Sequence, residues 1–169
     1  ANSFYGYLGF LPGEISMYSG VKKLLPGYTL TFTKSQFKLM KYFELEVSKK
    51  GQSEDIDKLL QNAVKSQLVA DVPVGIFLSG GLDSSLLAYY VSKYKKLKSF
   101  SIGFKEGGYD ESEHAHAVAK KIGTEHYSEE FGAKDVIEIY EKIITKLDEP
   151  LADASLIPTY KVSQLAREH

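Results

Sequence analysis

The most informative segment of the chain runs from Gly75 to Ser85 and reads Gly-Ile-Phe-Leu-Ser-Gly-Gly-Leu-Asp-Ser-Ser. Its first part continues an apolar run that predicts a buried strand over 74–78, and two glycines then lead to a helix predicted over 84–94. Glycines let a backbone approach an anion closely, and the unpaired amides and positive dipole at a helix start favour negative charge. The segment therefore predicts a phosphate-binding loop. A tight turn with a serine cap is the alternative interpretation.

The same segment lacks the lysine of nucleoside triphosphatases. Gly75 and Gly80 have the spacing of the Walker motif, but Gly81 and Leu82 stand where that motif has Lys followed by Ser or Thr. Because this lysine reaches the β- and γ-phosphates, its absence disfavours transfer of a γ-phosphate. Asp83 would repel a phosphate unless a divalent cation lay between them, so we predict it as a Mg²⁺ ligand.

The segments around this loop alternate between strand and helix. Apolar residues repeat at helical spacing from Ile56 to Leu68, with Ser53 as the expected N-cap. Strand, helix, strand and helix in alternation are typical of a parallel sheet with crossover helices, so we predict an α/β fold for residues 51–169. The further expected strands are 99–104 and 126–131, and the further expected helices are 112–122, 135–147 and 156–168.

The first 50 residues have a different pattern. Glycine and proline separate short apolar pieces, and 28–33 and 37–43 are rich in β-branched and aromatic residues with Lys34-Ser35 between them, which predicts a β-hairpin. The net charge also changes near Gly51, from +4 over residues 1–52 to −5 over residues 53–169. Chance variation between two solvated surfaces explains this charge difference equally well. We expect a small hairpin segment before the α/β domain.

Composition excludes several classes of protein. The 169 residues include no cysteine, which excludes disulfides, cysteine zinc sites and thiol nucleophiles and fits a reducing compartment. A net charge of −1 argues against a dedicated binder of duplex DNA. No run approaches the roughly 18 apolar residues of a membrane span, and residues 1–10 carry no secretion signal. We expect a cytoplasmic protein without a membrane or nucleic-acid partner.

Three histidines are weaker candidates. His114 and His116 lie two residues apart on an expected helix and so point to different faces, which favours solvated or packing roles over a metal pair. His126 is expected to be a strand residue near the site rather than a catalyst.

Two charged groups also leave alternatives open. Asp148, Glu149 and Asp153 surround a proline turn and are either a solvated turn or the lining of a substrate or metal pocket. The lysines between residues 93 and 98 are either an RNA-binding patch or complements to a helix dipole, and the second reading is the more usual one.

The residues from Ser79 to Ser85 resemble the PP-loop of ATP pyrophosphatases, which split ATP between its α- and β-phosphates to adenylate a substrate. Further segments are similar, in the same order, to the synthetase domain of glutamine-dependent asparagine synthetases. These segments are 71–78, 99–104, 109–115 and 147–153. β-Lactam-forming synthetases and tRNA-modifying PP-loop enzymes share the loop and are the enzymatic alternatives. A non-catalytic nucleotide-binding remnant is the other alternative.

The resemblance implies a Rossmann-like α/β fold of the PP-loop ATP pyrophosphatase type, with ATP, Mg²⁺ and aspartate as ligands. Asp83 would hold Mg²⁺. Phe77, Ile102 and Gly103 would contact adenosine, and Leu78 would also belong to the ATP site. The implied reaction is attack of the aspartate β-carboxylate on the α-phosphorus, release of pyrophosphate, and attack of ammonia on the aspartyl adenylate. The implied pyrophosphate contacts are Ser79, Gly80, Gly81, Ser84 and Ser85.

Residues 16–28 resemble the end of that family's N-terminal glutaminase domain. We therefore expect residues 1–50 to be the tail of a glutaminase domain with its linker, and residues 51–169 to be the first part of the synthetase domain. The family's glutaminase uses an N-terminal cysteine, whereas this chain begins with Ala1, so ammonia would come from a glutaminase domain absent here. The family also continues into a Ser-Gly-x-Gly-x-Asp-Glu loop that completes the site. We expect an internal part of a longer enzyme that is inactive alone. The resemblance is also compatible with a homodimer.

Overall fold

The computed structural model describes residues 2–46, 55–105 and 112–169. The chain divides into two compact units. Unit 1 comprises Ala1–Gln52 and Lys146–Asp153, and unit 2 comprises Ser53–Thr145 and Ala154–His169. The prediction that the chain divides into residues 1–50 and 51–169 stays a prediction.

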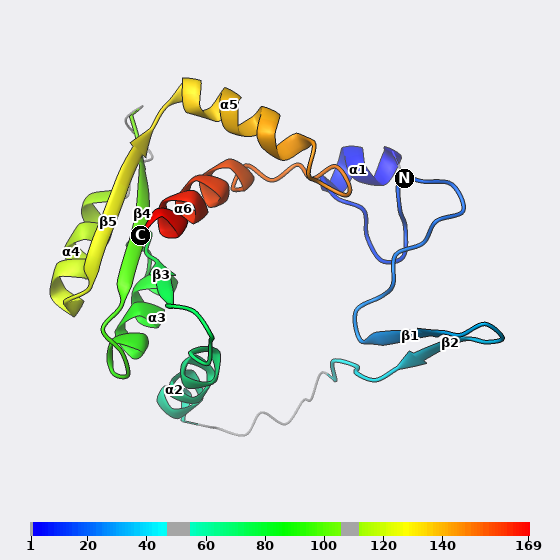
Figure 1. Cartoon of the computed structure of the whole chain (residues 1–169), viewed down its shortest axis with the longest axis horizontal. Coiled ribbons are helices and arrows are strands. Elements are labelled where there is room, and N and C mark those ends of the chain that lie inside the picture. The colour runs from blue at the N-terminus through cyan, green and yellow to red at the C-terminus, as the bar shows by residue number, and fades with distance from the viewer. Residues whose placement is uncertain (1, 47–54, 106–111) are drawn as a thin grey trace. The chain divides into compact units, whose positions relative to one another are not determined.

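In its described residues, unit 2 is built on a three-stranded parallel sheet with the strand order β3-β4-β5 (Figure 1). Each pair of neighbouring parallel strands is joined by a crossover connection that contains a helix. Helix α3 lies between β3 and β4, and α4 lies between β4 and β5. This arrangement confirms the predicted α/β fold. The strands are β3 (Gly75–Phe77), β4 (Lys98–Phe104) and β5 (Glu125–Phe131), and the helices are α2 (Ile56–Gln67), α3 (Leu82–Ser92), α4 (Ser112–Ile122), α5 (Ala133–Ile144) and α6 (Leu156–Glu168).

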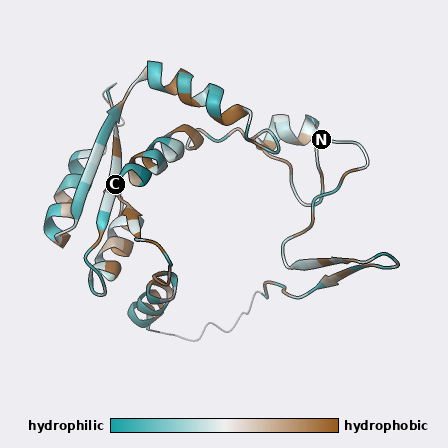
Figure 2. Cartoon of the chain, viewed as in Figure 1, coloured by the Kyte–Doolittle hydropathy of each residue, from teal (hydrophilic) through white to brown (hydrophobic). Residues whose placement is uncertain are grey.

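Helices α4 and α6 cover opposite faces of this sheet (Figure 1). Phe100 on β4 packs against Val162 and Leu165 of α6. Successive side chains of a strand point to opposite faces, so Ser99 and Ser101 face the other way, toward α4. Figure 2 shows hydrophobic and hydrophilic stretches alternating along α5, as expected for a helix with one apolar side.

Helices α2 and α3 pack against each other around Val64, Tyr90, Val91 and Leu97. The hydroxyl of Tyr90 donates a 2.7 Å hydrogen bond to Oδ1 of Asp57. This bond raises the pKa of Tyr90 to about 12 and lowers the pKa of the Asp57 carboxyl, because it stabilises the neutral phenol and the ionised carboxylate.

The prediction of a buried strand over 74–78 is wrong for most of this segment. Gly75 is exposed and Phe77 is 47% exposed, Val74 and Ile76 are half-buried, and Leu78 is buried at 1% exposure. Strand β3 lies at an edge of the sheet as the described residues form it, so a side chain at its end has a neighbouring strand on one side. The expected N-cap Ser53 lies outside the described residues. Asp55 is the N-cap of α2, and its side chain accepts from the amide of Asp57.

Unit 1 contains the predicted β-hairpin and one short helix that the sequence pattern did not predict. The hairpin pairs β1 (Tyr28–Phe32) with β2 (Phe37–Lys41) in antiparallel register, which confirms the prediction. The short helix is α1 (Asn2–Leu8), and none of its residues is buried. Because helix periodicity is recognised from a buried apolar face, α1 left no such signal.

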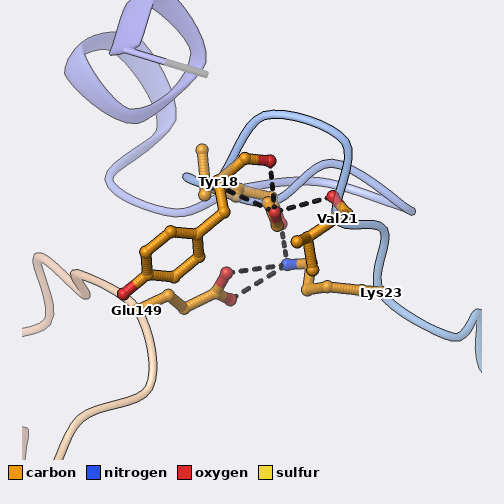
Figure 3. A network of polar contacts seen from close by, with 6 residues as sticks. Tyr18, Val21, Lys23 and Glu149 are labelled. Atoms are coloured by element: carbon orange, nitrogen blue, oxygen red, sulfur yellow. Dashed lines mark hydrogen bonds and ion pairs between the residues drawn. The ribbon is translucent and has the colours of Figure 1, made fainter.

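Lys23 joins the N-terminal part of unit 1 to its segment 146–153 (Figure 3). Its ammonium donates to the carbonyl of Leu11 at 2.6 Å and to both carboxylate oxygens of Glu149 at 2.9 and 3.2 Å. The amide of Ala152 also donates to the carbonyl of Gly9 at 2.9 Å.

None of the helices in the described ranges has the length and apolar character that a membrane span needs.

Candidate functional site

The chain turns sharply after β3, where the sequence predicted a phosphate loop. The amide of buried Leu78 still donates to the carbonyl of Phe100 on β4 at 2.8 Å. Gly80 then has a φ of +83°, in the left-handed region that favours glycine. A Cβ at Gly80 would lie 2.6 Å from Cβ of His114 and 2.7 Å from the amide nitrogen of Ala115. Glycine is therefore required here by both conformation and space.

Two serine hydroxyls hold the loop in place. The hydroxyl of Ser84 donates to the carbonyl of Gly81 at 3.2 Å and accepts from the amide of Ser79 at 3.3 Å. The hydroxyl of Ser79 lies 3.0 Å from that of Ser84 and accepts from the amide of Gly81 at 3.3 Å. These amide bonds are long, and an anionic oxygen is a stronger acceptor than a hydroxyl. A phosphate oxygen can therefore replace the hydroxyls at the amides of Ser79 and Gly81.

The start of α3 adds further donors to the loop. Its N-cap is Gly81, which has no side chain to cap the helix. Among the described residues, none is hydrogen-bonded to the amides of Gly80, Leu82 and Asp83. These amides lie at the positive end of the helix dipole. The hydroxyl of Ser85 is buried and has no hydrogen-bond partner within the described part of the chain. The loop thus presents donors suited to an anion.

A cavity of about 290 Å³ lies beside the loop, at the carboxyl end of the sheet. Ligands of open α/β sheets bind at this edge. The predicted residues Phe77, Leu78, Ser79 and Ile102 line it, whereas Gly103 does not. The other lining residues are Phe100, Ser101, Phe104, Ala115, Pro158, Thr159 and Val162.

Helix α6 supplies lining residues that sequence reasoning missed, namely Pro158, Thr159 and Val162. They follow the loop by almost 80 residues, and no local motif connects them to it. The available signal was the combination of an amphipathic C-terminal helix and a parallel sheet, whose faces such helices cover. The walls of the cavity are mostly apolar, which suits a flat aromatic ring system.

Asp83 lies exposed in the first turn of α3. Across the residues that the structure describes, no group of three or more histidine and acidic side chains could hold a metal ion. Mg²⁺ is commonly bound by one or two carboxylates together with substrate phosphates and water. Asp83 therefore fits a cation that arrives with a phosphate ligand rather than a preformed metal centre.

Three other candidate residues have structural partners, namely His116, His126 and Glu149. The rings of His116 and His126 are 4.7 Å apart, so His116 pairs across two elements and not with His114. Burial, and then the nearby His116, lower the pKa of His126. Glu149 belongs to unit 1 and is held by Lys23.

Two of the lysines near the end of α3 also have partners. Lys93 lies 4.5 and 4.7 Å from the ring centroids of Tyr89 and Tyr90. Lys98 donates to the carbonyl of His169 at 2.8 Å. These lysines therefore contribute contacts to the fold of unit 2.

Comparison with known proteins shows the family of this chain. The asparagine synthase family model matches residues 55–169. The chain is 39% identical over 178 residues to the putative glutamine-hydrolyzing asparagine synthetase 2 of Methanocaldococcus jannaschii. This alignment covers 99% of this chain and 34% of that protein. It is 33% identical over 172 residues to the glutamine-hydrolyzing asparagine synthetase 1 of Bacillus subtilis, covering 95% and 26%. It is 31% identical over 140 residues to the human glutamine-hydrolyzing asparagine synthetase, covering 79% and 21%.

The parallel sheet, the glycine loop and the helix start define an α/β domain of the PP-loop adenine-nucleotide class. Within that class, the chain belongs to the asparagine synthase family, a family of ATP-using ligases. It spans about a third or less of the length of the curated relatives it matches.

Proposed function

We propose that the chain forms part of the ATP site of a ligase that makes asparagine. In this reaction the β-carboxylate of aspartate attacks the α-phosphorus of ATP, and the bond from that phosphorus to the bridging oxygen breaks to release pyrophosphate. Ammonia then attacks the acyl carbon, and AMP leaves with the electron pair of the acyl–oxygen bond. Similarity to asparagine synthetases over 99% of this chain supports this choice over the other PP-loop chemistries.

One observation carries the nucleotide part of the proposal. The donor-rich loop and the apolar cavity share Ser79, because this residue bonds within the loop and also lines the cavity. A ligand with a polyanionic end and a flat apolar end would therefore meet both surfaces at once. ATP has this chemistry.

The roles of the site residues follow from their positions. The loop amides, with Ser79, Gly80, Gly81, Ser84 and Ser85, would bind the pyrophosphate portion. Donors fixed before the reaction stabilise the charge that develops on a leaving group, without reorganisation during the step. Asp83 would hold Mg²⁺, which supplies further neutralisation of that charge.

The adenosine would lie against the cavity walls. Phe77 and Leu78 at the end of β3 and Ile102 on β4 form one part of these walls, and α6 forms another. Gly103 is the next residue along β4 and would contact the nucleotide from outside the cavity lining.

The residues that bind the other substrates would lie partly in the portions of the relatives that this chain does not match. Ammonia would come from glutamine hydrolysis by a glutaminase domain, a proposal supported by the similarity of the chain to glutamine-hydrolyzing asparagine synthetases. Aspartate would bind beside the α-phosphate. We expect the 169-residue chain alone to release no pyrophosphate in response to aspartate.

Calorimetry with α,β-methylene-ATP and Mg²⁺ tests the proposal, because this analogue resists cleavage at the proposed position. We expect Asp83→Asn to weaken binding by about tenfold, the effect of about 1.4 kcal/mol. The matched control is Glu141→Gln, which makes the same charge change on the exposed surface of α5. Equal affinity of the Asp83→Asn variant and the wild type would rule out the metal role of Asp83. Binding by neither protein would remove support for a nucleotide site in this chain.

A further inference from the structure

A row of hydrogen-bonded side chains crosses the face of the sheet that α4 covers. The oxygen of Ser99 lies 2.7 Å from Oγ1 of Thr124 and 2.8 Å from Nδ1 of His126. The oxygen of Ser101 lies 3.1 Å from Nε2 of His126 and 3.1 Å from Oγ of Ser128. Ser99 and Ser101 are both buried. Both ring nitrogens of His126 are therefore engaged on β4.

A neutral imidazole with its proton on Nε2 satisfies the bonds of this row. Ser101 donates its proton to Ser128, so its oxygen accepts from Nε2–H of His126. A neutral imidazole carries one N–H, so Nδ1 accepts from the hydroxyl of Ser99, whose oxygen accepts from Thr124. Every donor in the row then has an acceptor. A proton on Nδ1 would reverse the bond to Ser99 and displace the donor of Thr124.

His116 continues this row onto α4. Its ring meets the ring of His126 edge-on, with centroids 4.7 Å apart and an interplanar angle of 82°. Its Nδ1 lies 3.0 Å from the carbonyl oxygen of Ser112, the first residue of α4. Because a carbonyl can only accept, Nδ1 of His116 is the donor. The His116 side chain therefore connects His126 to the start of α4.

The start of α4 also touches the phosphate loop. The space beside Gly80 is closed by Cβ and the carbonyl carbon of His114 and by the amide nitrogen of Ala115. Ala115 is completely buried and packs in one cluster with Leu78, the residue before the loop. A shift of the first turn of α4 would therefore change the space in which Gly80 turns.

We propose that His126 and His116 form a positioning pair, which holds the first turn of α4 against Gly80 and so fixes the shape of the phosphate loop. The pair touches no proposed substrate and acts through α4. Its effect on nucleotide binding rests on the proposed function, whereas its effect on the loop does not.

The pair makes the loop sensitive to pH. The side chains that face His126 are Ser99 and Ser101 from β4, Ser128 from β5, Thr124 from the residue before β5, and His116 from α4. Within the described ranges, His116 is the titratable group that acts on the charge of His126. Protonation of His126 breaks the order of the row and adds a charge beside the His116 ring. We therefore expect the contact between α4 and the loop to weaken as the pH falls.

Nuclear magnetic resonance on the full chain tests this inference. The histidine ring signals and the backbone amide signals of Gly80 and Ala115 are followed from pH 8 to pH 5. We expect the Gly80 and Ala115 signals to shift with the same midpoint as the ring of His126. The His116→Gln variant removes the ring contact and should lose most of this shift. The His116→Phe variant keeps an aromatic ring there and should restore the pH 8 position of the Gly80 signal.

His114 is the necessary control, because it is the histidine that lies against Gly80. In the His114→Gln variant, we expect the Gly80 shift to keep the midpoint of His126. A Gly80 signal that follows His114 alone, or that ignores His126, would overturn the proposal. His116 is exposed, so its variants keep the test decisive if His126→Gln does not fold.

Affinity for α,β-methylene-ATP with Mg²⁺ at pH 8 and pH 6 separates this inference from the proposed function. We expect the wild type to lose severalfold more affinity than His116→Phe. A loop that follows His126 in a chain that binds no nucleotide would support the positioning pair and contradict the proposed function. Nucleotide binding together with Gly80 and Ala115 signals that do not shift with His126 would support the proposed function and contradict the positioning pair.

Discussion

The two faces of strand β4 present different chemistry. Toward α6, Phe100 packs against Val162 and Leu165 in an apolar cluster. Toward α4, Ser99 and the side chains bonded to it form a polar row. Apolar packing is non-directional and sets how strongly a layer is held, whereas hydrogen bonds between buried groups require particular positions. The α6 face is therefore expected to govern stability and the α4 face to govern the geometry of the loop.

The largest effect is expected from emptying the α6 face. Phe100→Ala should reduce the free energy of unfolding by about 3–5 kcal/mol, because it removes a buried aromatic side chain and leaves a cavity. Urea unfolding followed by circular dichroism measures this. Phe77→Ala makes the same change on the exposed edge strand and should cost clearly less. Equal costs for the two variants would contradict the assignment of Phe100 to the core.

A smaller effect is expected where α4 meets the loop. Gly80→Ala should cost more than the roughly 1–2 kcal/mol of a Cβ in the left-handed conformation, because the new Cβ also meets α4. Gly123→Ala is the matched control, since Gly123 has a φ of +79° and nothing within 4 Å of its Cβ position. The difference in unfolding free energy between the two variants isolates the α4 contact. No difference would mean that the loop is not confined by α4.

On the polar face, Ser99→Ala should cost about 1–3 kcal/mol, because it leaves the buried partners Thr124 and His126 without their shared hydroxyl. The control is Ser163→Ala on the exposed side of α6, with an expected change of less than about 0.5 kcal/mol. Thermal unfolding of both variants checks this. A cost at Ser99 no larger than at Ser163 would show that the row contributes no stability.

The smallest effect is expected in the pH dependence of the unfolding free energy, through His126 on the same face. The fold lowers the pKa of His126, so the unfolded chain takes up its proton first as the pH falls. The contribution of His126 to the free energy of unfolding is fully present above the unfolded pKa of about 6.5. It decreases as the pH falls from there through the folded pKa. The fall in stability from pH 8 to pH 5 should therefore be smaller in His126→Gln than in the wild type. An identical pH profile in both proteins would contradict the assigned direction.

The sequence alone predicted the elements whose signals are local. The apolar run, the glycines and the polar first turn predicted β3, the loop and α3, because each depends on neighbouring residues. The exposure of Phe77 was missed, because it depends on which strands flank β3 and not on Phe77 itself. The start of α3 was expected at Ser84 and lies at Leu82, where the glycines end.

The parts of the site that come from distant segments could not be predicted in this way. His116 and His126 lie on a helix and a strand, and the crossover that joins these elements decides that their rings meet. Pro158 and Thr159 reach the cavity because α6 covers one face of the sheet. The spacing of these residues along the chain carries no information about such contacts.

The ion pair of Lys23 has a consequence for the order of folding during synthesis. Its partner Glu149 is 126 residues further along the chain. At about 5–20 residues per second, a ribosome adds that stretch in roughly 6–25 s. During this interval Lys23 and the β-hairpin have been synthesised, but the segment that completes unit 1 has not. Helix α6 of unit 2 is made only afterwards, so unit 1 is completed while unit 2 is still being made.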